Sequence, residues 1–394
     1  MSYKKYQSLL VNALFLFSIY FFLGMKNSSA ENASRYLGAL SGIYHVGFKD
    51  YHLINTKSCP NKFYDKSTQH SFSINNPKHC DEIWLRIYYP TESVGISNYY
   101  PAQSIIDDIK SFRKNMSTSE ISQINNIKSY SLKDANISKG KFPIIFFSPG
   151  YGIPAQNYEN IITNLVRHGY IVVGINSQFI NGKIVSDEGH SIEMVNPSKS
   201  IDKKKLFLNS ISDLSYALEY LRSGKMNNNI TSSINWDSIG LLGHSLGAGT
   251  ITYLPKNNIK AIASLDFTID LLDKNDCRKI RDTPFMQVFS SSMYLQNKTG
   301  HFPYYCKNQK LSKDNYVVIL RNLQNYNDAD YSMHLNFTDY STLQYHPVIL
   351  NGLNELYKNP QQRFLGTGNG KGLTKTINTN LLNFFNRYLK KNHE

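Results

Sequence analysis

The segment from Ser238 to Gly249 constrains the fold of this 394-residue chain more than any other. A short apolar run leads into Gly243-His244-Ser245-Leu246-Gly247, and small residues that favour a helix follow it. A sharp turn between a strand and a helix leaves no room for a side chain at either flanking glycine. The pattern therefore predicts a strand, a turn that exposes Ser245, and a helix, with Ser245 as a candidate nucleophile. An ordinary strand-to-helix turn is the alternative interpretation.

A serine nucleophile needs a general base and an acid that orients the base, and around such a turn they follow in the order Ser, acid, His. Asp266 is the first acid after Ser245 at a predicted strand end, directly after the apolar run 259–265. Open α/β sheets place their sites at the carboxyl ends of strands, so Asp266 is the predicted acid. Three later acids lie in a polar stretch and are interpreted as surface carboxylates: Asp270, Asp273 and Asp276.

Four histidines follow Asp266. His334 comes one loop after the strand-like run 316–320, which suits a general base that reaches over the edge of a sheet. The other three have simpler explanations: a loop position for His301, a helix start for His346 and the chain terminus for His393. His334 is therefore the predicted base.

Apolar runs typical of strands alternate with apolar residues at helical spacing. The strands are predicted near 142–148, 170–176, 259–265, 285–289 and 316–320, besides the strand that ends at the serine turn. Helical spacing is found over 158–166, 211–221 and 377–388. This alternation predicts a mainly parallel sheet covered by helices on both faces. We expect one domain over 31–394, with polar insertions near 91–140 and 180–205.

Several separated stretches make the chain resemble the platelet-activating-factor acetylhydrolases, which are α/β-hydrolases. The resemblance covers roughly residues 45 to 390 and rests on the serine turn, on Leu265-Asp266 and on the segment 334–339, with further similar stretches at 85–90, 146–152 and 167–173. It implies an α/β-hydrolase fold with Ser245, Asp266 and His334 as catalytic triad. Two departures flank the pocket: Pro149 where the family usually has His, and Asn176-Ser177-Gln178 where it tends to carry a charged pair.

The tetrahedral intermediate of acyl transfer needs preformed N–H donors for its oxyanion. The amide of Leu246, directly after the nucleophile, is one expected donor. The second is expected in the loop after the strand at 142–148, and the resemblance assigns it to the Tyr151 amide. Gly150 and Gly152 on either side give the backbone the freedom to turn that N–H inward. A plain turn is the alternative interpretation of this Gly-Tyr-Gly.

The resemblance implies a metal-independent serine esterase that removes short or oxidised sn-2 acyl chains from phospholipids. A general lipase or a polyester-type esterase with the same triad is the alternative within enzymes. An exported binding protein on an inactive hydrolase fold is the alternative from another class, and the intact set of Ser245, Asp266 and His334 argues against it. The expected partner is a lipid or small ester substrate, and no cofactor is expected.

The first thirty residues differ from the rest of the chain. Lys4 and Lys5 precede an apolar run at 9–23, and Ser28-Ser29-Ala30 offers small residues at a cleavage site. This pattern predicts a secretory signal peptide over 1–30 and a secreted or periplasmic protein. An uncleaved membrane anchor is the alternative, although the run is short for spanning a bilayer.

An export signal changes the interpretation of the four cysteines. In an oxidising compartment an even number of cysteines indicates disulfides, although four of them permit three connectivities. We favour the two local pairs, Cys59–Cys80 and Cys277–Cys306. A metal site built from Cys59, His70, His79 and Cys80 is the alternative, but this spacing fits no compact zinc pattern.

Basic residues outnumber acidic ones, 43 to 29, for a formal net charge of +14. No nucleic-acid-binding motif accompanies this excess, so nucleic acid is not an expected partner. A basic exported esterase is suited to contact an anionic membrane surface or an acidic cell-wall polymer. We favour the simpler interpretation that a lysine-rich composition reflects the host genome. The segment 366–371 is not a phosphate-binding loop, because its spacing is wrong and neither Ser nor Thr follows its lysine.

Overall fold

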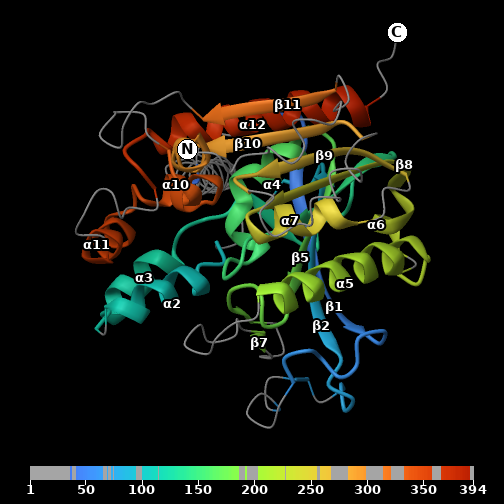
Figure 1. The fold of residues 1–394 in the computed structure, drawn as a ribbon, viewed down its shortest axis with the longest axis horizontal. Helices are drawn as coiled ribbons and strands as arrows, with labels where there is room; N and C mark the ends of the chain where they lie inside the picture. The colour runs from blue at the N-terminus through green and yellow to red at the C-terminus, as the bar shows by residue number, and fades with distance from the viewer. Residues whose placement is uncertain are drawn as a thin grey trace, which may run out of the picture.

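A nine-stranded sheet forms the framework of the computed structural model (Figure 1). The structure describes residues 36–37, 41–64, 69, 72–73, 75–94, 100–113, 115–185, 191–192, 203–226, 228–254, 258–267, 283–298, 314–320, 332–356 and 365–390. The strands, in their order across the sheet, are β11 (Asn315–Leu320), β10 (Phe285–Ser290), β9 (Ile259–Leu265), β8 (Ile234–His244), β4 (Phe142–Ser148), β5 (Ile171–Ser177), β2 (Asp81–Thr91), β1 (His45–Asn55) and β3 (Ser131–Lys133).

The six strands from β11 to β5 run parallel to one another, whereas β2 is antiparallel to both β5 and β1. Every residue of β4 and β5 is buried, as expected for parallel strands whose two faces are both covered. The mainly parallel sheet predicted from the alternation of apolar runs is therefore confirmed, and the predicted strands match the observed ones to within a residue. The long pair β1 and β2 adds an antiparallel edge.

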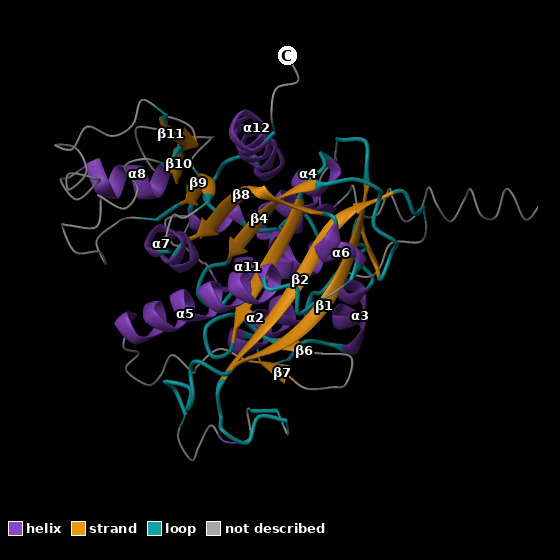
Figure 2. Ribbon diagram, turned by 90° about the vertical axis from the view of Figure 1, so that its right-hand side faces the viewer, coloured by secondary structure: helices purple, strands orange, loops and turns teal. Residues whose placement is uncertain are grey.

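Helices cover both faces of the sheet, as predicted. On one face, α4 (Glu159–Arg167) and α12 (Gly370–Leu389) bury Ile162, Leu165, Leu381 and Phe385. On the other face, α5 (Lys203–Arg222) and α7 (Leu246–Tyr253) bury Leu214, Ala217 and Ile251. Figure 2 shows these two helical layers on opposite sides of the strands.

Shorter elements complete the described part of the chain. They are α2 (Gln103–Phe112), α3 (Thr118–Asn125), the 3-10 helix η2 (Ala155–Tyr158), the hairpin of β6 (Ile184–Val185) and β7 (Ser191–Ile192), α6 (Asn229–Ser232), α8 (Ser291–Lys298), the 3-10 helix η5 (His334–Phe337), α10 (Tyr340–Leu343) and α11 (Pro347–Leu356). Helices α2 and α3 lie within the segment predicted as a polar insertion at 91–140. Their buried Ile105, Ile109 and Ile124 pack with Leu343 and Ile349 in a third, smaller core.

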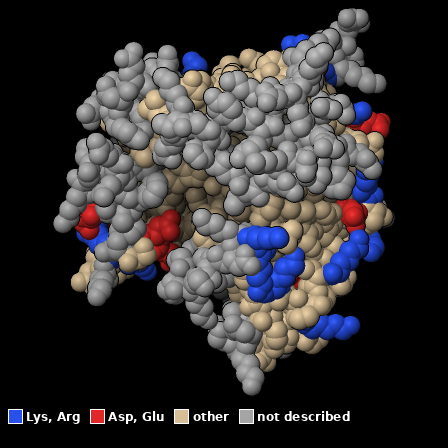
Figure 3. All heavy atoms as spheres, in the orientation of Figure 1, with Lys and Arg blue, Asp and Glu red and all other residues tan. Residues whose placement is uncertain are grey.

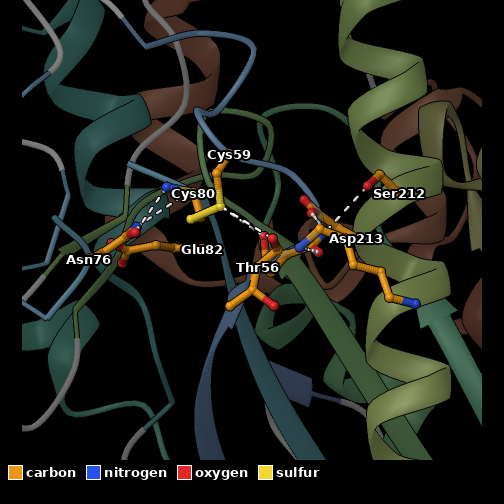
Figure 4. Close-up of a disulfide and its surroundings, with 9 residues drawn as sticks. Thr56, Cys59, Asn76, Cys80, Glu82, Ser212 and Asp213 are labelled. Atoms are coloured by element: carbon orange, nitrogen blue, oxygen red, sulfur yellow. Dashed lines mark hydrogen bonds between the residues drawn. A yellow bond between two sulfur atoms is a disulfide. The ribbon is translucent and has the colours of Figure 1, made fainter. Parts of the chain in front are cut away.

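A disulfide joins Cys59 to Cys80, as predicted, and connects the end of β1 to the start of β2 (Figure 4). In Figure 4, Asn76 and Glu82 lie on one side of the bond, and Ser212 and Asp213 of α5 on the other. Because disulfide sulfurs are not thiolates, the alternative zinc site loses two of its four ligands. The second predicted pair, Cys277 and Cys306, lies outside the described residues, as do the signal segment 1–30 and most of the insertion predicted near 180–205. None of the helices within the described ranges combines the length and apolarity required to cross a membrane.

Candidate active site

Ser245 stands at the tight turn between β8 and α7, where the sequence predicts it. Its backbone has φ 52° and ψ −123°, a left-handed conformation that is unfavourable for a residue with a side chain. Two main-chain hydrogen bonds hold the turn: Ser245 N–H donates to the carbonyl of Leu265 at 2.9 Å, and Gly249 N–H donates to the carbonyl of Ser245 at 3.2 Å. The fold therefore holds a strained serine backbone next to the end of β9.

The glycines on either side of the turn are required sterically, as the sequence argument predicts. A Cβ at Gly243 would lie 2.5 Å from the carbonyl oxygen of Gly247. A Cβ at Gly247 would lie 2.0 Å from the carbonyl oxygen of Ser148, at the end of β4. The atoms in the way belong to the backbone, so no rotation of a side chain relieves the clash.

Asp266 and His334 are hydrogen-bonded to each other, with 2.8 Å between Nδ1 of the imidazole and Oδ2 of the carboxylate. Asp266 directly follows β9 and is 1 % exposed. Its carboxylate also accepts hydrogen bonds from the N–H of Ser290 at 2.7 Å and from the Ser290 hydroxyl at 3.0 Å. These bonds fix the carboxylate, which in turn orients the ring of His334 through Nδ1.

His334 lies beside the serine turn as well as beside Asp266. Its ring packs against that of His244, the residue before Ser245, with ring centroids 4.4 Å apart and planes inclined by 34°. The structure thus brings together Asp266, His334 and the turn that carries Ser245, although 68 residues separate the acid from the histidine. Of the alternatives weighed for base and acid, His346 is buried against Tyr36 in the smaller core. The others lie outside the described residues: Asp270, Asp273, Asp276, His301 and His393.

The loop after β4, which carries Tyr151, packs directly against the serine turn. A Cβ at Gly150 would lie 3.3 Å from the Cβ of Ser245. The N–H of Gly150 donates to the hydroxyl of Tyr158 at 3.1 Å, and the N–H of Gly152 donates to the carbonyl of Ile180 at 2.9 Å. Both glycines that flank Tyr151 are therefore fixed by hydrogen bonds, and Gly152 has the positive φ of 78° that favours glycine.

Tyr158 and His244 belong to this site, and sequence reasoning missed both. The Tyr158 hydroxyl lies 2.8 Å from Nδ1 of His244, and both side chains are fully buried. Burial lowers the pKa of His244 well below its usual value, and the neighbouring charge of His334 lowers it further. The spacing over 158–166 predicts a helix, and no local pattern indicates that the Tyr158 hydroxyl meets a histidine 86 residues away.

Asp339 anchors the segment that carries His334, and it too was missed. Its buried carboxylate accepts the N–H groups of Glu159 at 2.7 Å and Asn160 at 2.8 Å in the first turn of α4, and the hydroxyl of Tyr100 at 2.9 Å. A carboxylate at a helix N-terminus satisfies unpaired N–H donors and interacts favourably with the helix dipole. Burial raises the pKa of Asp339 to about 6, against the lowering effect of these hydrogen bonds.

One of the two departures from the resembled family has a structural role. Asn176 is fully buried at the end of β5. Its side-chain oxygen accepts the N–H of Ala155 at 2.7 Å, and its amide group donates to the carbonyl of Trp84 at 3.1 Å. Asn176 thereby connects η2 to β2 and helps to fix η2, the 3-10 helix that ends at Tyr158.

The structure is similar to that of a ferulic acid esterase from Streptomyces cinnamoneus, with a TM-score of 0.67. The likeness covers 90 % of this chain and 93 % of that chain at 16 % sequence identity. No protein-family profile matches the chain, and no curated protein does. Membership of the platelet-activating-factor acetylhydrolase family stays a prediction. The likeness and the mainly parallel sheet together show that the chain has an α/β-hydrolase fold.

Proposed function

We propose that the protein is a serine hydrolase that cleaves carboxylic esters. The observation that carries the proposal is the Asp266–His334 hydrogen bond beside the strained turn of Ser245, in an α/β-hydrolase fold. A buried carboxylate bound to one nitrogen of an imidazole leaves the other nitrogen to act as general base. A structural neighbour that is a ferulic acid esterase agrees with ester chemistry.

In the proposed mechanism, Ser245 attacks the ester carbonyl while His334 takes the hydroxyl proton and then gives it to the leaving alcohol. Asp266 holds the imidazole in the required tautomer and stabilises the imidazolium that forms. The amides of Leu246 and Tyr151 are the proposed oxyanion donors, and losing one such donor costs roughly 3–4 kcal/mol of transition-state stabilisation. In the second half of the reaction, His334 takes a proton from water, which attacks the acyl group, and then gives that proton to the Ser245 oxygen as it leaves.

The proposed substrates are esters with short acyl chains, including short or oxidised sn-2 chains of phospholipids. The support for this is the sequence resemblance to platelet-activating-factor acetylhydrolases. Leu246 also packs at the rim of a small apolar cluster with Phe207, Ile211 and Tyr253, which offers one wall to an acyl chain. A general lipase or polyester-type esterase stays the alternative, and feruloyl esters belong among the substrates to be tested because of the structural neighbour.

The proposed location is outside the cytoplasm, after cleavage of the segment 1–30. The Cys59–Cys80 disulfide supports this, because disulfides persist in oxidising compartments. Figure 3 shows basic side chains gathered over the region of α5. Contact with an anionic membrane surface is therefore part of the proposal.

Covalent labelling with a fluorophosphonate tests the proposed chemistry. Wild-type protein should be labelled, and Ser245→Ala should not be, with an unchanged circular dichroism spectrum. Asp266→Asn should lower kcat by a factor on the order of 10⁴, because the wrong histidine tautomer is then favoured. His168→Ala is the matched control, since His168 directly follows α4 and its ring bonds to the carbonyl of Asn164 in the last turn of that helix. Folded wild-type protein without labelling would favour the binding protein on an inactive fold.

A series of esters with one alcohol and acyl chains from acetyl to palmitoyl tests the substrate class. Each CH₂ that fits the pocket gains up to about 0.8 kcal/mol of burial, and one that does not fit disturbs the reactive geometry. We expect kcat/KM to rise over the first few carbons and then to fall sharply, with no effect of EDTA. Comparable kcat/KM values for acetyl and palmitoyl esters would support the general lipase instead.

A further inference from the structure

Tyr158 connects the loop that carries Tyr151 to the histidine beside the proposed base. It is the last residue of η2 and is fully buried. Its hydroxyl has two polar neighbours, the N–H of Gly150 at 3.1 Å and Nδ1 of His244 at 2.8 Å. Its ring packs edge-on against Phe147 and against His244, at centroid distances of 4.8 Å and 5.6 Å. The hydroxyl therefore has a fixed position between the two elements.

The direction of these hydrogen bonds follows from the donors. The amide of Gly150 has only a hydrogen to offer, so the Tyr158 oxygen accepts it. Burial raises the pKa of Tyr158, which keeps its hydroxyl protonated, and that hydrogen is available to Nδ1 of His244. Nδ1 then accepts, and the proton of the neutral His244 ring is on Nε2. The main chain of His334 also acts on this ring and partly opposes the lowering of its pKa.

The protonation state and position of the His244 ring act in turn on His334. His244 is fully buried, and its ring lies 4.4 Å from that of His334. When His334 takes the proton of Ser245 it becomes a cation, and a second cation at this distance would oppose the step. A His244 ring that stays neutral avoids that repulsion. Its position also limits where the His334 ring lies relative to Ser245.

We propose that Tyr158 and His244 form a positioning pair that couples the loop after β4, which carries the proposed oxyanion donor Tyr151, to the proposed general base His334. The inference rests on the proposed function and adds two residues to it. One hydroxyl holds the Gly150 amide, and hence the adjoining Tyr151, at a fixed place beside Ser245, and it also sets the tautomer of the ring on which His334 packs. The pair acts through Tyr151 and His334 and does not touch the substrate.

Tyr158→Phe tests the pair, because it keeps the buried ring and removes only the hydroxyl. Tyr170→Phe is the matched control: Tyr170 is equally buried, and its hydroxyl bonds to Asn386 Oδ1 at 2.8 Å on the α12 side. For Tyr158→Phe we expect kcat to fall by about 10- to 100-fold, with KM within about twofold, since the defect lies in transition-state stabilisation. Binding of a short-chain trifluoromethyl ketone, which forms a tetrahedral oxyanion with the serine, should weaken in parallel with kcat/KM. Tyr170→Phe should retain nearly all activity and inhibitor affinity.

A second comparison covers the case in which Tyr158→Phe does not fold. His244→Gln keeps an acceptor for the Tyr158 hydroxyl, whereas His244→Leu removes it, so the Gln variant should have a kcat at least about tenfold higher. Equal kcat values for these two variants, or equal losses in Tyr158→Phe and Tyr170→Phe, would overturn the positioning pair while the proposed function stands. Wild-type protein that neither hydrolyses esters nor reacts with a fluorophosphonate would overturn both.

Discussion

Replacing Gly247 with alanine should separate the two halves of the proposed oxyanion hole. The new Cβ would lie 2.0 Å from the carbonyl oxygen of Ser148 and 2.5 Å from that of Pro149, whereas ordinary contact begins near 3.4 Å. Either α7 or the loop after β4 must therefore move by roughly 1.4 Å. A displacement of about 1 Å in a catalytic arrangement costs on the order of 10² in rate, and overpacking a buried site costs about 1–3 kcal/mol of stability.

The assay combines kcat/KM on a short-chain ester with the free energy of unfolding from urea titration. Gly372→Ala is the control, because Gly372 is exposed in the first turn of α12 and its Cβ would lie 3.6 Å from the nearest atom. Alanine is the better helix former by about 0.5–1 kcal/mol, so this variant should be slightly more stable and equally active. Gly247→Ala with wild-type kcat/KM and stability within about 0.5 kcal/mol would refute the steric explanation of the turn.

Three further predictions concern the disulfides and a buried carboxylate at the edge of the sheet formed by β1 and β2. Replacing Cys59 and Cys80 by serine should lower the free energy of unfolding, measured by urea titration, by about 3 kcal/mol, because the disulfide closes a loop of 21 residues. Peptide mapping without reductant should show the Cys277–Cys306 link. A free thiol at Cys277 would contradict that link. Burial alone would raise the pKa of Glu82, but hydrogen bonds from His52, from Asn76 and from the Ser73 backbone lower it from 4.5 to about 2. Its stabilisation, about 3 kcal/mol, is therefore complete above pH 4.5 and is lost as the pH falls toward 2, so Glu82→Gln should flatten the acid limb of stability against pH. The same dependence of unfolding free energy on pH below 4.5 in wild type and Glu82→Gln would contradict this.

The parts of the fold that local chemistry governs are predictable from the sequence. The turn of Ser245 follows from two glycines at fixed spacing, because steric conflict between backbone segments leaves no other residue there. The parallel strands follow from short apolar runs, because both faces of such strands are buried. Asp266 is predicted as the acid from its place at a strand end, and His334 as the base from its place after the last predicted strand; the structure shows the two hydrogen-bonded to each other.

The remaining parts of the site depend on contacts between segments far apart in the chain. Asp339 caps α4 across 180 residues, and Tyr158 meets His244 across 86. The isoleucines of α2 lie in a segment that is polar as a whole, yet they form a third, smaller core with α10 and α11.

The sequence by itself determined the tight turn at Ser245, the parallel strands and the order of the three proposed catalytic residues, because spacing and hydrophobicity along the chain carry that information. The tertiary structure alone decided which buried polar groups hold the loop of Tyr151 and the ring of His334 in place. A buried hydroxyl or carboxylate is stable only where its partners are, and those partners come from other elements of the fold.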